Sequence, residues 1–276
     1  MTKQKFVVKA DGTKEVFDGN KLEQSLQHSK ASPHVVRLIV EHIEKEIGEE
    51  TKTVDIFEHA SALLRKFERP TAFRYSLKRA IMDLGPTGFP FEDFVAEIFK
   101  ARGYTTLTDQ RVLGNCVEHE VDVVAYNDDK LIMTEVKFHN EPGLRSDLKV
   151  ALYVKARFDD LSDKEFEGYG KKRTLTEGWL VTNTKFTSTA IHYGLCKGIH
   201  MIGWNYPDKD NLQTLVEQYA LHPITCLRSL TQTQMRQIVA ENVVLCKTLA
   251  ERTDLMKSIG LTDDEIHAVV EEINIL

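Results

Sequence analysis

Apolar residues recur at helical spacing over the first third of the chain. Behind Ser32-Pro33, a pair typical of a helix start, an apolar stripe follows at intervals of three and four residues. Its members are Val36, Ile39, Val40, Ile43 and Ile47. Two more helices are expected, one capped by Thr53 and one starting near Pro70. The stripe of the first of these is Val54, Phe57, Ala60, Leu64 and Phe67.

Turn signals stand at both ends of this helical region. Residues 6–10 and 14–17 predict a small hairpin that turns at Asp11-Gly12. At the other end, Gly85-Pro86 terminates the last helix. The stretch 87–90 that follows, Thr-Gly-Phe-Pro, is therefore the clearest domain boundary in the chain.

Beyond this boundary the periodicity changes. A helix comes first, with Phe91, Phe94, Val95, Ile98 and Phe99 on one side. Three runs that alternate like strands follow, over 104–112, 117–126 and 130–138. A long helix, a buried strand, a short helix and a last strand complete the series, at 144–162, 178–182, 188–195 and 199–203. The order α-β-β-β-α-β-α-β predicts an α/β sheet with helices on both faces, and residues 230–276 predict a helical appendage.

Composition and charge indicate which cellular compartment and which binding partners to expect. The net charge of −6 gives no general attraction to nucleic acid, so DNA would have to meet a local basic surface. No apolar run approaches the roughly 18 residues that span a bilayer. The four cysteines lack the spacing of a zinc knuckle and are interpreted as buried thiols of a reducing compartment. We expect a cytoplasmic protein without a membrane partner.

Charged residues interrupt two of the expected strands. Asp122 alternates with the apolar Val121 and Val123, and Glu135 and Lys137 alternate in the same way on the next strand. If the two strands pair through the turn at 127–129, these three side chains point off one side of the sheet. Charged side chains are uncommon on strands whose other residues are apolar, so a functional role could explain them. An ordinary cross-strand ion pair is also compatible with this pattern.

This combination has a chemical use. Two neighbouring carboxylates, Asp122 and Glu135, repel each other unless a cation lies between them, and Mg²⁺ or Mn²⁺ prefers such oxygen ligands. Such an ion can activate a water molecule and polarise a phosphodiester. Lys137 then supplies a positive charge near the phosphate. The pattern indicates a hydrolytic metal site whose ligands are Asp122 and Glu135.

Four segments of this region resemble the Mrr-type restriction endonucleases of the PD-(D/E)xK superfamily over about residues 90–205. The segments are Phe91–Val95 leading to Gly103-Tyr104, Glu120–Ala125, Glu135–His139 and Leu180–Thr187. The resemblance implies that Asp122 binds the metal, Glu135 takes the central acidic position and Lys137 is the catalytic lysine. It also places the acid of the first helix at Glu92, or less favourably at Glu97.

The N-terminal segment resembles the ATP-cone of ribonucleotide reductases over about residues 5–86. The matching stretches are Val7–Gly12, Glu15–Leu22, Lys52–Ile56 and Ala72–Tyr75. The resemblance implies that ATP or dATP binds as a regulator, with Lys9 and Lys21 near the phosphates and Val8, Gly12 and Thr53 lining the pocket. Ala10 stands where many cones have arginine, and a small helical domain with solvated lysines is the alternative.

Several basic residues follow the acidic pattern and are open to two interpretations. They either contact phosphates or form a solvated surface, and they are Arg145, Lys149, Lys155, Arg157 and Lys171-Lys172-Arg173. His139, at the end of its strand, either supports the site or is a polar residue satisfied by its neighbours. The second interpretation of His139 is favoured.

The sequence thus predicts three segments: an ATP-cone over 1–86, a nuclease domain over 87–212 and a helical extension over 213–276. The leading interpretation is a Mg²⁺-dependent DNA endonuclease that ATP or dATP regulates, in restriction or defence, and that acts as a homo-oligomer. The alternative is a nucleotide-sensing DNA-binding or regulatory protein whose nuclease fold does not cut.

Overall fold

The computed structural model describes residues 5–9, 12–85, 87–141 and 143–276, without the side chain of His28. The chain divides into two compact units, one of residues 1–78 and 274–276 and one of residues 79–273. Ala10, Asp11 and Pro86, which enter the expected turn, pocket and boundary, lie outside the described residues. The domain boundaries at 86 and 212 stay predictions.

A small sheet opens the N-terminal unit. The expected hairpin forms from two short antiparallel strands, β1 (Phe6–Val8) and β2 (Lys14–Val16). A third strand, β3 (Thr51–Lys52), pairs with β1 in parallel. Gly12, between β1 and β2, has a φ of +80°, a left-handed conformation that glycine adopts without strain.

The helices that follow in the chain are α1 (Gly19–His28), α2 (Pro33–Glu46), α3 (Thr53–Phe67) and α4 (Arg69–Met82), and the division between the two units falls within α4. Ser32 occupies the N-cap position of α2, without a side-chain hydrogen bond, and Pro33 is the first residue of the helix, as expected. The prediction for α3 was partly wrong. Lys52 is its N-cap, because β3 extends to that residue, and Val54 and Phe67 are 40% and 49% exposed. The buried side chains of α3 are Ile56, Ala60, Ser61 and Leu64.

The second unit is built on a five-stranded sheet in the order β12-β10-β6-β5-β4. The strands are β4 (Thr105–Leu113), β5 (Glu118–Tyr126), β6 (Leu131–Lys137), β10 (Glu177–Thr182) and β12 (His200–Ile202). The first three form the predicted antiparallel meander, and the last two join it in parallel. Asn127 closes the turn between β5 and β6 by accepting from the backbone N–H of Lys130 at 2.9 Å.

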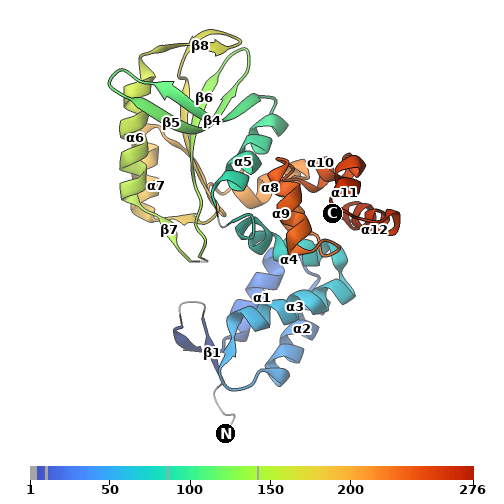
Figure 1. The fold of residues 1–276 in the computed structure, drawn as a ribbon. Coiled ribbons are helices and arrows are strands. Elements are labelled where there is room, and N and C mark those ends of the chain that lie inside the picture. Colours follow the sequence, from blue (N-terminus) through green and yellow to red (C-terminus); the bar gives the residue numbers. More distant parts are fainter. Residues whose placement is uncertain (1–4, 10–11, 86, 142) are drawn as a thin grey trace. The chain divides into compact units, whose positions relative to one another are not determined.

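Helices cover both faces of this sheet (Figure 1). α5 (Phe89–Ala101) lies on one face, where Phe99 meets Trp179 edge to face at 5.6 Å. α6 (Leu148–Ser162) and α7 (Ser188–Lys197) lie on the other. All five apolar residues expected on the inner side of α5 are buried. The predicted α-β-β-β-α-β-α-β order is confirmed as the framework of a mixed α/β fold.

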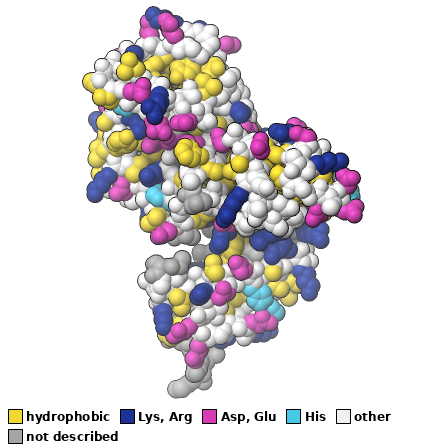
Figure 2. Space-filling view, viewed as in Figure 1, with side chains coloured by type: hydrophobic (Ala, Val, Ile, Leu, Met, Phe, Trp, Pro, Cys, Tyr) yellow, Lys and Arg dark blue, Asp and Glu magenta, His cyan; other side chains and the backbone are white. Residues whose placement is uncertain are grey.

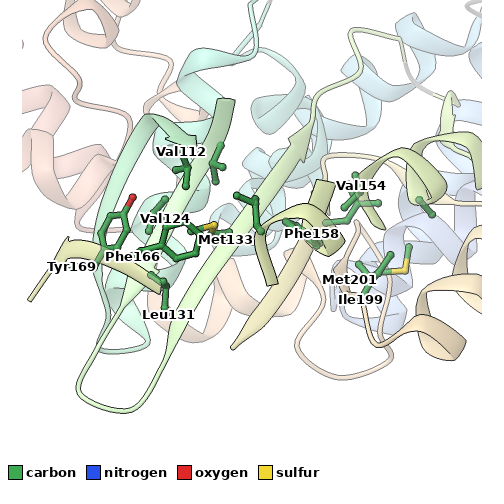
Figure 3. Packing of buried hydrophobic residues seen from close by; sticks show 14 of the residues in the cluster. Val112, Val124, Leu131, Met133, Val154, Phe158, Phe166, Tyr169, Ile199 and Met201 are labelled. Atoms are coloured by element: carbon green, nitrogen blue, oxygen red, sulfur yellow. The ribbon is translucent and has the colours of Figure 1, made fainter. Parts of the chain in front are cut away.

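The core between the sheet and α6 is apolar and tightly filled. Val124 and Met133 from the sheet pack against Val154 and Phe158 from α6 in one cluster (Figure 3). A Cβ atom at Gly178 on β10 would come within 2.2 Å of the Phe158 ring. Glycine at this position therefore lets the helix approach the strand closely.

The structure adds elements that the sequence pattern did not reveal. A hairpin of β8 (Glu165–Tyr169) and β9 (Lys171–Thr174) follows α6, and β7 (Arg145–Ser146) pairs with β11 (Lys185–Phe186). The helix expected from residue 144 begins only at Leu148. Asp147 stops it earlier because its carboxylate accepts from the Lys149 backbone N–H at 3.0 Å.

The C-terminal part of the second unit is helical, as expected. Its helices are α8 (Leu212–Tyr219), a 3₁₀ turn η1 (Ile224–Cys226), α9 (Gln232–Ala240), α10 (Cys246–Ala250), α11 (Thr253–Ser258) and α12 (Asp263–Ile273). Glu272 accepts from the backbone N–H groups of Arg228 and Ser229, and so ties α12 to the segment before α9. Among the described residues, no helix combines the length and apolarity that crossing a membrane requires.

Leu180 tests the core of the sheet. It is fully buried on β10, so Leu180→Ala should lower the free energy of unfolding by about 2–5 kcal/mol. Leu113→Ala is the matched control, because Leu113 is 59% exposed and its truncation should change the free energy by less than about 0.5 kcal/mol. Both tryptophans, Trp179 and Trp204, belong to the second unit, so urea unfolding followed by their fluorescence reports on that unit. Equal losses for the two variants would contradict the packing described.

Candidate active site

Asp122 and Glu135 meet where the backbone pairing of β5 and β6 ends. The last paired residues of the ladder are Val123 and Thr134, and the next step of the register places Asp122 opposite Glu135. Asp122 reaches across the gap and accepts from the backbone N–H of Val136 at 2.6 Å. A side chain thus continues the connection between two strands that begin to separate.

Glu135 is held by an arginine of α6. Arg157 forms an ion pair with Glu135, and the two side chains are only 11% and 16% exposed. The same guanidinium donates to the carbonyl oxygen of Glu120 at 2.7 Å and to the Tyr153 hydroxyl at 2.6 Å. Arg157 was expected to be a phosphate contact or a solvated residue, and here it is a partner of the acidic pair.

Burial and mutual repulsion make these carboxylates hard to ionise. Burial, followed by the charge of Asp122, raises the pKa of Glu135 to about 7 although Arg157 and Lys137 oppose the shift. Burial also raises the pKa of Asp122, against the hydrogen bond from Val136 and the charge of Arg157. The site therefore carries a stored repulsion that a cation would relieve.

Glu92 belongs to the same acidic cluster. It lies in the first turn of α5, and burial and then the charge of Asp122 raise its pKa to about 7. Lys137, at the exposed end of β6, acts electrostatically on Glu135 and on His139. The structure thus brings together Asp122, Glu135, Lys137 and Glu92. Glu97, the less favoured candidate, is paired with Lys100 at 2.6 Å.

Asp109 is a member of the cluster that sequence reasoning missed. It lies on β4 between residues paired with Val121 and Val123, which places it opposite Asp122. Its φ of +51° is unusual for a residue within a strand, and its charge raises the pKa of Asp122 and Glu92. Asp109, Asp122 and Glu135 therefore form one row across three strands. An acidic residue inside the alternating run 105–113 was the available signal.

A buried polar network fixes the backbone just beyond Glu135. The fully buried Asn183 accepts from the His139 backbone N–H at 2.8 Å and donates to the His139 carbonyl at 2.9 Å. Thr182 donates to the carbonyl oxygen of Lys137 at 2.8 Å. The His139 ring meets the Ser146 hydroxyl at 3.0 Å, so its interpretation as a satisfied polar residue is confirmed. This network holds the backbone that carries Lys137.

Several of the basic residues expected at phosphates have protein partners. Lys155 pairs with Asp159, Lys172 with Glu165, and Arg173 donates to the carbonyl oxygen of Lys130 at 3.0 Å. Arg145 and Lys149 are exposed. Figure 2 shows basic and acidic side chains interspersed over the visible face of the sheet-bearing unit. On that face there is no broad basic surface.

The residues expected to bind nucleotide lie near one another in the N-terminal unit. Lys9 and Lys21 both pair with Glu15, at 2.7 and 3.2 Å. Val8 is paired with Lys52 across β1 and β3, so Thr53 follows directly as the first residue of α3. Gly12 lies in the loop between β1 and β2. A carboxylate therefore occupies the position between the two lysines.

The acidic cluster offers hard oxygen donors. Carboxylate oxygens of Asp122, Glu135 and Glu92 are the ligands that Mg²⁺ and Mn²⁺ prefer. Among the described residues, these three carboxylates do not bring their ligand atoms within 4.8 Å of one another. Glu135 forms an ion pair with Arg157 instead.

The chain matches two family models. Residues 86–213 match a restriction endonuclease model, and residues 222–276 match the C-terminal model of AF1548-like proteins. Residues 1–85 lie outside both matched segments. The first match identifies the domain with the five-stranded sheet as a restriction endonuclease domain.

Two relatives match a larger share of the chain. An uncharacterized protein of Archaeoglobus fulgidus is 36% identical over 179 residues, which are 64% of this chain and 97% of the relative. The crystal structure of AF1548, a protein of unknown function, has 35% identity and a TM-score of 0.56, over 68% of this chain and 97% of that one. The chain belongs to the AF1548-like family, and residues 86–213 form its restriction endonuclease domain.

A more remote structure is Can2 from Sulfobacillus thermosulfidooxidans in complex with cyclic tetra-adenylate. It has 12% identity and a TM-score of 0.31, over 72% of this chain and 51% of that one. A score at this level establishes no common fold.

The raised pKa of Glu92 makes stability depend on pH. Between about pH 4.5 and 7 the folded state keeps a proton that the unfolded state releases, so stability falls as the pH rises through this window. Glu92→Gln mimics the protonated acid. We expect it to exceed the parent protein in stability by about 1 kcal/mol near pH 8, a value reduced for the solvent screening of a half-exposed group, and to match it near pH 4, below the unfolded-state pKa.

Urea unfolding at several pH values, followed by tryptophan fluorescence, measures this difference. Glu97→Gln on the same helix is the matched control, because Lys100 already stabilises the charge of Glu97. An advantage of Glu92→Gln that stays constant over the whole range would show that Glu92 is not held in its protonated form.

Proposed function

We propose that the chain is a divalent-metal-dependent DNA endonuclease that hydrolyses phosphodiester bonds at the Asp122–Glu135 pair. The observation that carries this proposal is the pair itself. Two partly buried carboxylates face each other at the end of the β5–β6 ladder, next to Lys137, in a restriction endonuclease domain. A structural ion pair would require only one acid and one base.

The donor atoms are of the kind that a hard cation such as Mg²⁺ or Mn²⁺ prefers, and the carboxylates would draw together around one. Asp122, Glu135 and Glu92 are all oxygen donors, and the pKa of each is raised first by burial and then by neighbouring negative charges. A cation held by Asp122 and Glu135 would lower the pKa of a water molecule and polarise the phosphodiester.

The chain's own residues supply the remaining chemistry. Lys137 places a positive charge beside the scissile phosphate, where negative charge increases as water attacks phosphorus and the P–O bond to the leaving oxygen breaks. Glu92, with a pKa of about 7, can take the proton of the attacking water near neutral pH. The network of Asn183 and Thr182 keeps the backbone at Lys137 and His139 in place.

Arg157 supports a second candidate function. Its ion pair with Glu135 uses the carboxylate that a cation would need. If the chain is an endonuclease, Arg157 releases Glu135 when the cation and DNA bind, and its guanidinium then contacts the phosphate. If Arg157 instead keeps its ion pair with Glu135, the chain is a DNA-binding or regulatory protein that does not cut.

Substitutions of Asp122, the proposed metal ligand, and Lys137, the proposed charge at the phosphate, distinguish a cutting enzyme from a non-cutting protein. Asp122→Asn removes a ligand charge, so metal binding and cleavage of plasmid DNA should be lost together. Lys137→Ala removes no ligand, so metal binding should persist while the cleavage rate falls by about 10²–10³. Plasmid nicking at saturating Mg²⁺ and Mn²⁺ gives the rate, and calorimetry with Mn²⁺ gives the binding.

Glu97→Gln is the control for a general loss of negative charge. If the parent protein binds Mn²⁺ and DNA without nicking it, while Arg157→Gln nicks it, Arg157 blocks the site. If no variant cleaves either DNA or RNA, the non-cutting alternative holds.

We also propose that the N-terminal unit binds ATP or dATP and that binding regulates the nuclease. Support comes from Lys9 and Lys21, which converge on Glu15 beside the parallel β1–β3 pair. One domain of this kind offers one cutting site, so a double-strand break is simplest for two copies in a symmetric homo-oligomer.

The lysines make the nucleotide proposal testable. Lys9→Ala and Lys21→Ala should each weaken ATP and dATP binding by roughly 10- to 100-fold, the effect of losing a charge-assisted hydrogen bond. Glu15→Gln should strengthen binding, because the carboxylate competes with the phosphates for both lysines. Lys14→Ala is the matched control, since Lys14 pairs with Glu50 at 2.7 Å. Calorimetry checks affinity, and light scattering with and without nucleotide checks assembly.

A further inference from the structure

Three metal-ligand side chains meet on the outer surface of α2 and α3. Glu46 is 3.3 Å from the Nε2 atom of His42, one helical turn earlier on α2, and 3.6 Å from the Nε2 atom of His59 on α3. The ligand atoms of all three residues lie within 4.8 Å of one another. In the space-filling view, histidine side chains lie beside an acidic one on this part of the N-terminal unit (Figure 2).

The spacing suits a tetrahedral metal ion. Two bonds of about 2.0–2.1 Å that meet at a tetrahedral angle end about 3.3–3.4 Å apart. The contacts of 3.3 and 3.6 Å run from His42 to Oε1 and from His59 to Oε2 of Glu46, so each carboxylate oxygen already lies near one imidazole at about that edge length. The two imidazole rings are 5.0 Å apart and nearly perpendicular, so both nitrogens can face one point without a clash between the rings. The three ligand atoms lie within 4.8 Å of one another, so side-chain rotation that brings one oxygen of Glu46 toward both nitrogens would complete the set.

The backbone under these side chains is firmly placed. Ile39 and Ile43 of α2 and Ala60 and Leu64 of α3 are fully buried, or nearly so, in one core cluster. His42 and Glu46 lie four residues apart on one side of α2, and His59 stands next to the buried Ala60. The packing of the two helices therefore sets the separation of the ligands before any ion arrives.

The same side chains could form ion pairs between protonated histidines and Glu46. That arrangement needs two positive imidazoles 5.0 Å apart around one carboxylate. A metal ion satisfies all three ligands together and needs no pair of positive charges side by side. The side chains are 44%, 55% and 37% exposed, so an ion has access from solvent.

We propose that His42, Glu46 and His59 form a Zn²⁺ site that links α2 to α3. Two imidazoles and one carboxylate select a borderline ion such as Zn²⁺ over Mg²⁺, which prefers oxygen alone. Three protein ligands leave the fourth position to water. The site is chemically distinct from the all-carboxylate cluster at Asp122, and it gives the N-terminal unit a bound ion of its own.

Titration of the metal-free full-length protein with Co²⁺, a spectroscopic substitute for Zn²⁺, tests the site. The parent protein should show the visible absorption of a four-coordinate Co²⁺ ion, and an equivalent of Zn²⁺ should displace it. His59→Ala and His42→Ala should each weaken binding at least tenfold. Zn²⁺ should raise the melting temperature of the parent protein and leave that of His59→Ala unchanged.

Two controls separate this site from others on the chain. His34→Ala removes another exposed histidine of α2 and should leave the Co²⁺ spectrum unchanged. Asp122→Asn disables the carboxylate cluster and should also keep the spectrum. The proposal is overturned if the parent protein shows no four-coordinate Co²⁺ spectrum, or if His59→Ala binds the ion as tightly as the parent does.

Discussion

The placement of two carboxylates on neighbouring buried strands is the constraint on which the rest of the second unit depends. Burial makes both Asp122 and Glu135 costly to ionise, and the charge of Asp122 adds to the cost at Glu135. Each carboxylate has a partner that offsets part of this cost. Val136 donates its backbone N–H to one, and Arg157 pairs with the other. Arg157 can do so only because α6 docks on the sheet through Val154 and Phe158. The core packing thus determines the electrostatics of the site.

The central strands and the acidic pair could be predicted because they depend on local signals. The turn at 127–129 joins β5 to β6 directly, so alternation along each strand fixes which side chains share a face. The roles of Arg157 and Asp109 could not be predicted in this way. The first depends on how a distant helix packs, and the second on an unusual backbone angle at one residue of β4.

Two other differences between the expected and the observed elements also have local causes. The hairpin of β8 and β9 is rich in charged residues and short of the alternating apolar pattern that marks a strand. In α3 the expected stripe included Val54 and Phe67, which lie at the two ends of the helix, where fewer residues pack around them. Apolar periodicity locates a helix well, but it assigns burial poorly near the helix ends.

The conformation of Asp109 also affects how copies of the protein can meet. β4 is the outer strand of its sheet, with β5 as its one neighbour in the portion of the chain that the structure describes. An outer strand with a regular backbone invites pairing with the same strand of another molecule, and continued pairing leads to aggregation. Asp109 interrupts the regular backbone of β4 and places an exposed charge in the middle of that strand. The residue that extends the acidic row therefore also protects the sheet from growing by addition of further chains.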